Sequence, residues 1–190
     1  MDTTNKIDRR VLRTKEAINK AFLELFSEKE LDQITINDIS ERANVNRGTV
    51  YLHYTDKYDL LNKCIDEHLT HLFITCTPID MNREEIDLIA EMMPVFTYFE
   101  NHFLFFSSML ANHRTSIFRE RLQQILVANI KEHLDRQDTY RDMDKEMLIQ
   151  FMASAFVGIV EWWIQNKMPH SPQYMAEQVR RLFERNNVNK

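Results

Sequence analysis

The chain is poor in the residues that interrupt helices. Its 190 residues include two glycines, Gly48 and Gly158, and four prolines. With so few glycines there is no phosphate-binding glycine loop. Hydrophobic residues make up 44% of the chain, and they recur at helical spacing over long stretches. The sequence therefore predicts an all-α protein of about nine helices.

Cysteines and long apolar runs are scarce too. The two cysteines, Cys64 and Cys76, fit a reducing compartment better than a disulfide framework. No apolar run reaches the roughly 18 residues that a membrane span requires. The first ten residues, MDTTNKIDRR, lack the apolar core of a signal peptide. We therefore expect a cytoplasmic protein with no membrane partner.

The sequence lacks the motifs of common enzyme classes. It has no nucleophile elbow and no HExxH zinc motif. The 29 acidic residues form no pattern beyond helix-surface charge. We therefore expect no enzymatic activity, no catalytic residue and no cofactor.

A net charge of −5 does not by itself indicate nucleic-acid binding, but the distribution of charge matters more than the total. Residues 6–15 carry five basic side chains against Asp8: Lys6, Arg9, Arg10, Arg13 and Lys15. Alone, this basic arm reads as a solvated helix start. Beside a DNA-binding unit, Arg9 and Arg10 are expected to lie along phosphates or in a minor groove.

Residues 34–61 have the pattern of two helices joined by a tight turn. The first helix has an apolar stripe at helical spacing: Ile34, Ile36, Ile39 and Ala43. Thr35 and Asp38 resemble a capping box, and the Thr35 hydroxyl and helix N-terminus can meet a phosphate. The helix is predicted to end at Ala43, because Asn44 tolerates a left-handed turn.

A second short helix is predicted from Arg47 to about Tyr54, capped by Asn46. Most of its side chains are of hydrogen-bonding types, whereas Val50 and Tyr54 are expected to pack inside. A helix that enters a major groove needs small residues for close approach, with donors and aromatic rings for bases and phosphates. The pair of helices is therefore laid out as a DNA-binding helix-turn-helix.

The run RANVNRGTVYLHYTDKYDLL resembles the N-terminal domain of the TetR (AcrR-like) bacterial transcriptional regulators. The matching residues are Gly48-Thr49-Val50-Tyr51, His53-Tyr54, Asp56-Lys57 and Leu60-Leu61. The chain departs from the family at Asn44, where Gly is usual, and at Tyr54, where Phe is usual. Asn accepts the same turn and Tyr keeps the aromatic ring. The resemblance is strong over roughly residues 9–65.

This resemblance implies that Thr49 and Tyr51 meet bases and phosphates, while His53 and Lys57 contact the DNA backbone. Arg47 fits the O6 and N7 atoms of guanine by its own chemistry. The complete predicted DNA-binding set is Arg9, Arg10, Thr35, Asn46, Arg47, Gly48, Thr49, Tyr51, His53 and Lys57.

We place a domain boundary after residue 76, so that 1–76 holds the helix-turn-helix with a linking fourth helix. Residues 77–190 form a second helical domain. This half resembles, more loosely, the C-terminal region of a Gram-positive subset of the same family. The resembling residues are Phe105-Phe106, Met109-Leu110, Phe156 to Val160, Trp162-Trp163, Ser171-Pro172 and Met175-Ala176. The resemblance implies a ligand-binding and dimerisation domain.

Dense aromatic residues in this domain are expected to form mostly core, but family members use cavities there for inducers. We predict an apolar cavity for a hydrophobic small molecule, closed by Trp162 or Trp163. The expected ligand-binding residues are Phe99, Phe103, Phe106, Phe118 and Trp162. A solid core, or control by a protein partner, is the alternative.

The last two long helices are the predicted homodimer interface. The expected contacts are Ala155, Gly158, Ile159, Met175, Val179, Leu182 and Phe183. The alternative is that the seam of the last helix is core within one chain.

Cys64, His68 and His71 share one helical face, a spacing that can hold zinc. The plainer interpretation, which we adopt, is a packed helix with His68 hydrogen-bonded and no metal. The function predicted from the sequence is a ligand-responsive repressor that binds a palindromic operator as a dimer. A sensor or docking protein controlled by a protein partner or a metal is the alternative.

Overall fold

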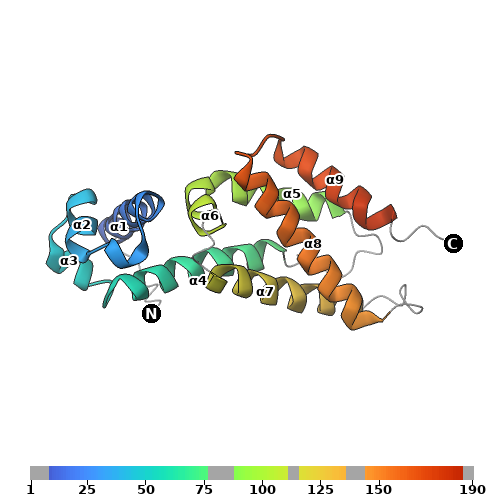
Figure 1. Ribbon diagram of the computed structural model, residues 1–190, viewed down its shortest axis with the longest axis horizontal. Helices are drawn as coiled ribbons and strands as arrows, with labels where there is room; N and C mark the ends of the chain where they lie inside the picture. The colour runs from blue at the N-terminus through green and yellow to red at the C-terminus, as the bar shows by residue number, and fades with distance from the viewer. Residues whose placement is uncertain (1–8, 77–87, 111–115, 136–143, 186–190) are drawn as a thin grey trace, which may run out of the picture. The chain divides into compact units, whose positions relative to one another are not determined.

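The computed structural model describes residues 9–76, 88–110, 116–135 and 144–185. Within these ranges every regular element is helical, with nine α-helices and one short 3-10 helix (Figure 1). The predicted all-α fold with about nine helices is therefore confirmed. In chain order the elements are α1 Arg9–Glu28, η1 Leu31–Gln33, α2 Ile36–Arg42, α3 Arg47–Tyr51, α4 Lys57–Cys76, α5 Leu88–Asn101, α6 Phe103–Leu110, α7 Ser116–Asp135, α8 Lys145–Gln165 and α9 Pro172–Arg185.

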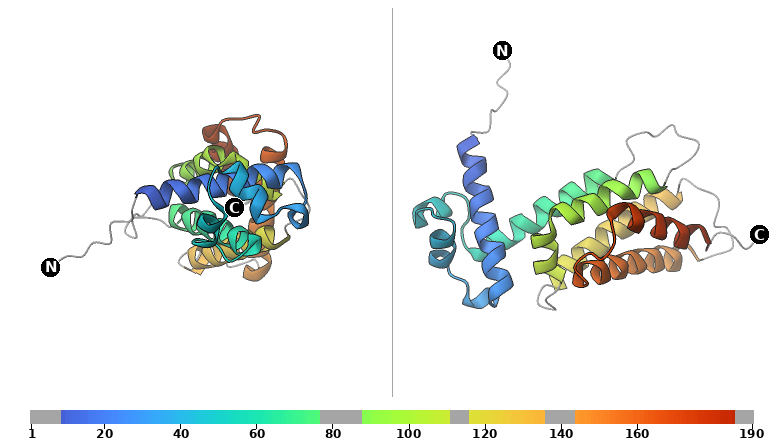
Figure 2. Two further views of the ribbon diagram at one scale, coloured as in Figure 1. Left: turned by 90° about the vertical axis from the view of Figure 1, so that its left-hand side faces the viewer. Right: turned by 90° about the horizontal axis from the view of Figure 1, so that it is seen from above.

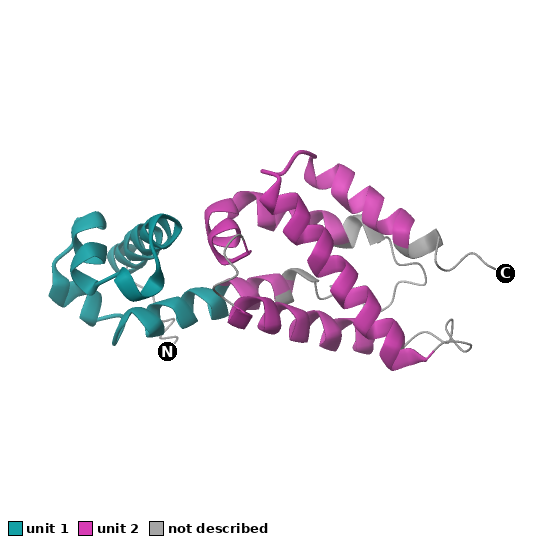
Figure 3. Ribbon diagram, in the orientation of Figure 1, with its two compact units in different colours: residues 1–67 teal, residues 68–190 magenta. Residues whose placement is uncertain are grey.

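The chain divides into two compact units, residues 1–67 and 68–190 (Figure 3). The division falls inside α4, between Glu67 and His68. The sequence had placed the boundary after residue 76, where this helix ends. The last nine residues of α4, nearly half of the helix, therefore belong to the second unit.

The first unit is built around the apolar stripe of α1, which packs against α2, while α2 packs against α3. Ile18 and Phe22 are fully buried, and the rings of Phe22 and Phe26 stack with centroids 5.8 Å apart. These residues recur every three or four positions, so one face of the helix is apolar along its length. The first turns of α4 supply Leu60, Leu61 and Ile65 to the same unit's core.

The second unit packs its helices in pairs. α5 lies against α9, α7 lies against α8, and α6 contacts both α7 and α8 (Figures 1 and 2). Aromatic rings fill the interior, and Phe96 meets Trp163 edge-to-face at 5.4 Å. The Trp163 ring nitrogen donates to the His170 carbonyl at 2.9 Å, which satisfies its buried N–H.

Helix α8 differs from the others in being apolar on more than one face. Among the described residues it is the one helix long and apolar enough to cross a membrane, a test that a core helix also meets. One face is buried, with Ile149, Ala153, Phe156, Val157, Val160, Trp163 and Ile164. An opposite stripe is exposed and still largely apolar, at spacings of four, three, four and four residues. This α8 stripe comprises Met147, Phe151, Ser154, Gly158 and Trp162.

Candidate nucleic-acid interface

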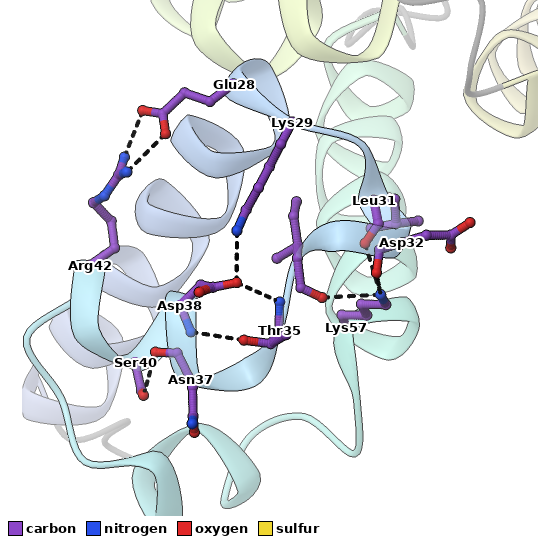
Figure 4. Close-up of polar contacts among 11 residues, drawn as sticks. Glu28, Lys29, Leu31, Asp32, Thr35, Asn37, Asp38, Ser40, Arg42 and Lys57 are labelled. Atoms are coloured by element: carbon purple, nitrogen blue, oxygen red, sulfur yellow. Dashed lines mark hydrogen bonds and ion pairs between the residues drawn. The ribbon is translucent and has the colours of Figure 1, made fainter.

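The N-terminus of α2 is held by a reciprocal cap. The Thr35 hydroxyl accepts the Asp38 backbone N–H at 3.2 Å, and the Asp38 carboxylate accepts the Thr35 N–H at 2.9 Å (Figure 4). Lys29 donates to the same carboxylate at 2.8 Å. Lys29 and Thr35 together lower the pKa of Asp38 to about 2, so this cap is charged at neutral pH. The capping box predicted from the sequence is present.

The turn after α2 has the backbone conformation that the sequence predicted. Asn44 has φ of 53°, in the left-handed region where asparagine is better tolerated than most residues. The Val45 N–H donates to the Ser40 carbonyl at 3.0 Å, and the Asn44 N–H donates to Glu41 at 3.1 Å. These bonds satisfy carbonyls at the end of α2. The turn therefore fixes the direction in which α3 starts.

Helix α3 is short and anchored on one side. The Asn46 side chain accepts the Gly48 N–H at 3.3 Å, as expected for its cap. Val50 is fully buried, and the buried Tyr54 donates its hydroxyl to the Asn19 side chain at 2.8 Å. Burial raises the pKa of Tyr54, so the phenol stays protonated. The helix ends at Tyr51, three residues earlier than the sequence predicted.

The outer side of α3 carries a matched pair of side chains. Arg47 donates to the Tyr51 hydroxyl at 3.1 Å, and its guanidinium lies 5.4 Å from the centroid of the Tyr51 ring. Both residues are exposed, while Thr49 and His53 are half-buried. The pair holds the guanidinium fork and the phenol in one orientation. Two of the predicted DNA-contact residues are thus brought together on one exposed face.

Gly48 lies beside this pair without a structural reason for lacking a side chain. Its φ is not positive, and a Cβ built there would meet only the Asn46 carboxamide oxygen, at 4.0 Å. That distance is an ordinary contact, so the fold itself would accept alanine. The open backbone at this position leaves room for the close approach of another molecule.

The sequence predicts that Lys57 contacts the DNA backbone, and in the structure its side chain bonds within the first unit. Its ammonium donates to the carbonyls of Leu31, Asp32 and Ile34 at 2.8, 2.9 and 3.0 Å (Figure 4). An ammonium has three N–H donors, so these three bonds use all of them. Lys57 therefore fastens the start of α4 to the connection between α1 and α2.

The remaining candidates in the first unit lie on its surface. Arg9, Arg10, Thr35 and Asn46 are exposed. Sequence reasoning missed Leu52, which directly follows α3 and is 80% exposed. Its position two residues after the buried Val50 is the signal that points it outward, because two residues turn a helix by roughly 200°.

The predicted ligand-binding residues separate into two groups. Phe99, Phe106 and Phe118 are fully buried. The ring centroid of Phe106 lies 4.5 Å from that of Phe99 and 6.0 Å from that of Phe118. Phe103 and Trp162 are exposed instead. Of the two tryptophans, Trp163 is the one that faces inward. The structure thus brings together three of the five predicted residues.

His68, on the part of α4 in the second unit, adjoins this aromatic cluster. The centroid of its ring lies 3.8 Å from that of Phe105, and the two rings are nearly parallel. The His68 Nδ1 atom lies 2.8 Å from the Tyr98 hydroxyl oxygen. Burial, helped by the nearby His102 and His71, lowers the pKa of His68 to about 3. The imidazole is therefore neutral at physiological pH. The hydrogen-bonded, packed His68 that the sequence favoured is what the structure shows.

The cysteine on this face of α4 is buried. Burial raises the pKa of the Cys64 thiol to about 12, so the thiol is protonated at neutral pH. Across the described ranges, no three His, Cys, Asp or Glu side chains are grouped closely enough to hold a metal ion.

The predicted dimer residues are also divided by the structure. Met175 and Val179 are buried within one chain, on a helix that packs against α5. Ala155 and Ile159 are half-buried, whereas Gly158 and Leu182 are exposed. The side chain of Phe183 lies outside the described residues. Exposed apolar surface in this region is therefore found along the α8 stripe and, on α9, at Leu182.

Comparison with known families and proteins places both halves of the chain. A family described as "Bacterial regulatory proteins, tetR family" matches residues 18–64, and one described as "Transcriptional regulator C-terminal region" matches residues 87–185. The uncharacterized helix-turn-helix-type transcriptional regulator YxbF of Bacillus subtilis is 27% identical over 184 residues, covering 91% of this chain. The chain spans 45% of the length of that relative.

One further relative by sequence and one solved structure are similar to this chain. A probable acrEF/envCD operon repressor of Escherichia coli K12 is 24% identical over 175 residues, which cover 82% of this chain and 78% of that protein. A TetR transcriptional regulator of known structure from Streptococcus agalactiae superposes with a TM-score of 0.63 at 25% identity. That superposition covers 90% of this chain and 96% of the other.

Proposed function

The chain belongs to the TetR family of bacterial DNA-binding transcriptional regulators, and from this premise we propose that it represses transcription by binding a palindromic operator as a homodimer. Members of such a family bind DNA rather than catalyse a reaction. The finer assignments that follow, of residues, assembly and control, rest on the contacts described above.

The observation that carries the proposal is the outer face of α3. Val50 anchors the helix inward, while Arg47, Gly48 and Tyr51 are exposed on the side away from the core. An open glycine backbone with a paired arginine and tyrosine suits a major groove, where guanine presents two acceptors to a guanidinium fork. Arg47 is the proposed base-reading residue, and Tyr51 orients it while reaching a base or phosphate.

Phosphate contacts are assigned to the residues around this helix. Arg9 and Arg10 are exposed at the start of α1, and Thr35 is exposed at the N-terminus of α2. The Thr35 hydroxyl accepts one bond within the cap, so its own proton remains able to donate to a phosphate oxygen. Asn46, Thr49 and His53 complete the set. Lys57 acts indirectly, by fixing the start of α4.

A homodimer follows from the symmetry of the proposed operator, because symmetric half-sites require a two-fold protein. The α8 stripe supports this assembly: Phe151 and Trp162 are exposed, and Gly158 between them leaves the backbone open. A continuous exposed apolar surface on a helix marks an interaction site. We assign the central contact to Gly158 with Ala155 and Ile159 at its border, and leave Met175 and Val179 in the core.

Control by a hydrophobic small molecule is proposed for the second unit. Phe99, Phe106 and Phe118 bring apolar rings together, and neutral His68 beside them offers a polar group to orient a ligand. Phe103 and Trp162 are withdrawn from the proposed pocket, since both are exposed. Screening apolar compounds for a rise in melting temperature and a loss of operator affinity tests this part separately. The regulator is proposed to act in the cytoplasm, where bacterial DNA lies.

The DNA-binding proposal is tested by selecting an operator from random duplexes and measuring affinity by fluorescence anisotropy. Tyr51→Ala is expected to weaken operator binding by about 1–3 kcal/mol. Tyr174→Ala removes a tyrosine that is 44% exposed, against 47% for Tyr51, and serves as the matched control on α9. Equal affinity of Tyr51→Ala and the wild type for the selected operator would contradict the proposed reading helix.

A further inference from the structure

We propose that Leu52 recognises thymine, by packing its side chain against a thymine C5-methyl group in the major groove. The proposal rests on the proposed DNA-binding function and deepens it. It assigns a base preference to an apolar residue that lies outside the polar contact set described above.

The first observation is the exposure of Leu52. It is 80% exposed, more than any other large hydrophobic side chain among the described residues. Scattered exposed leucines need no explanation in general. The position of this one, immediately after a helix with a functional outer face, is what distinguishes it.

The second observation is its direction. Leu52 is the C-cap of α3 and keeps helical backbone angles, with φ of −67° and ψ of −23°. At about 100° per residue it lies roughly opposite Val50, which is fully buried. Its side chain therefore points away from the core of the first unit, on the side of α3 that we propose faces DNA.

The third observation is the absence of a side chain one turn earlier. Helical side chains lean back over the preceding turn, and the residue four positions before Leu52 is Gly48. No side chain at that position covers the leucine, and a Cβ there would meet only the Asn46 carboxamide oxygen, at 4.0 Å. Leu52 and the bare backbone of Gly48 thus form one shallow apolar surface beside Arg47 and Tyr51.

The neighbouring side chains decide which partner this surface fits. Arg47 and Tyr51 are paired hydrogen-bonding groups, one of them cationic. A broad lipid-binding face would need a longer amphipathic helix, and α3 has five residues. Duplex DNA offers negative charge and acceptors for Arg47, and the thymine methyl is the apolar group that its major groove presents. The arrangement therefore fits a thymine next to the base read by Arg47.

The experiment uses the selected operator with single thymines replaced by deoxyuridine, which removes only the C5-methyl group. We expect one thymine in each half-site at which this change weakens wild-type binding about three- to tenfold, the scale of burying a methyl group. Leu52→Ala should weaken binding to the thymine operator by a similar factor and lose the sensitivity to deoxyuridine at that position. Its melting temperature should match the wild type, because the side chain is exposed.

Leu104→Ala is the matched control, since it truncates an exposed leucine on α6. It should keep both the affinity and the deoxyuridine sensitivity of the wild type. If deoxyuridine at every position affects Leu52→Ala as much as the wild type, the thymine proposal is overturned while the DNA-binding function stands. If the selection yields no preferred duplex, the proposed function fails first. Unchanged affinity of Leu52→Ala for every duplex would direct Leu52 to a protein or lipid partner instead.

Discussion

The two glycines of this chain share a property that the fold does not explain. Gly48 and Gly158 both lie within helices, neither has a positive φ, and both are exposed. A Cβ would meet a single atom at 4.0 Å at the first and nothing within 4 Å at the second. Glycine inside a helix costs roughly 1 kcal/mol relative to alanine. Each one lies on a surface that we assign to another molecule, DNA for Gly48 and a second subunit for Gly158.

Gly48→Ala should therefore separate stability from binding. The added methyl group raises helix propensity and meets no clash, so the free energy of unfolding should rise by up to about 1 kcal/mol. The same methyl group occupies the space where the backbone approaches DNA, so operator affinity should fall. Thermal melts and anisotropy titrations on one preparation measure both changes. Unchanged affinity would show that the backbone at Gly48 does not approach DNA closely.

At Lys57, in contrast to Gly48, substitution is expected to lower the stability of the fold. Lys57→Met keeps the apolar stem but removes an ammonium that bonds three carbonyls, so we expect a loss of about 1.5–3 kcal/mol in unfolding free energy. A lysine that contacted phosphate would instead leave stability unchanged and flatten the salt dependence of binding. Urea unfolding measures the first quantity. Lys20→Met is the control, because the Lys20 side chain is 74% exposed.

At the scale of the element, local signals predicted the helix-turn-helix well. The Thr35–Asp38 cap, the left-handed Asn44 and the Asn46 cap each depend on residues two to four positions apart, and all three are present. The role of Lys57 was not predictable in this way. Its carbonyl partners lie 23 to 26 residues earlier in the chain, so only the tertiary packing of the unit brings them together.

The last helices show a second limit of sequence reasoning. Helical spacing identified the apolar seam of α9 correctly, but periodicity does not say whether an apolar face meets the same chain or another one. Met175 and Val179 are buried on the helix that packs against α5 of the same chain. An apolar stripe on α8 stays exposed. Because both faces of α8 are apolar, its sequence pattern does not show which face is buried and which is exposed.

The packing of α4 against α5 and α6 within the second unit should make stability depend on pH. The ordinary pKa of histidine is 6.5, while that of His68 in the folded chain is about 3. Below pH 6.5 the His68 imidazole becomes protonated in the unfolded chain but stays neutral in the folded chain. Stability should therefore fall as pH drops from about 6.5 towards 3, by at most about 1.4 kcal/mol per pH unit from this group.

His68→Gln removes the titration and keeps a hydrogen-bonding group near the Tyr98 hydroxyl. Urea unfolding at pH 7.5 and pH 5 should show a smaller difference for this variant than for the wild type. His170→Gln, which alters an exposed histidine, should retain the wild-type difference. An identical pH dependence for His68→Gln and the wild type would contradict the lowered pKa.

At the scale of the whole molecule, the proposed function depends on two copies of the chain. Each recognition helix contacts a few base pairs, and a dimer reads two half-sites about one DNA turn, roughly 34–36 Å, apart. A ligand in the second unit can regulate only by favouring a spacing of these helices that the operator disfavours. Assembly is therefore the property on which both DNA binding and its control rest.

The α8 stripe allows assembly to be tested without damaging the fold. Val179→Asp would place a charge in the core, so it would report on folding rather than on the interface. Gly158→Glu with Phe151→Glu changes two exposed residues, and glutamate favours the helix over glycine. We expect a folded monomer of 22.9 kDa by sedimentation, with operator affinity lost because one subunit reaches one half-site. Gly158→Ala, which adds a single methyl group, should weaken the dimer less than the double variant. A double variant that sediments as a dimer and binds the operator normally would move the interface away from α8, while leaving the outer face of α3 as the surface that reads DNA.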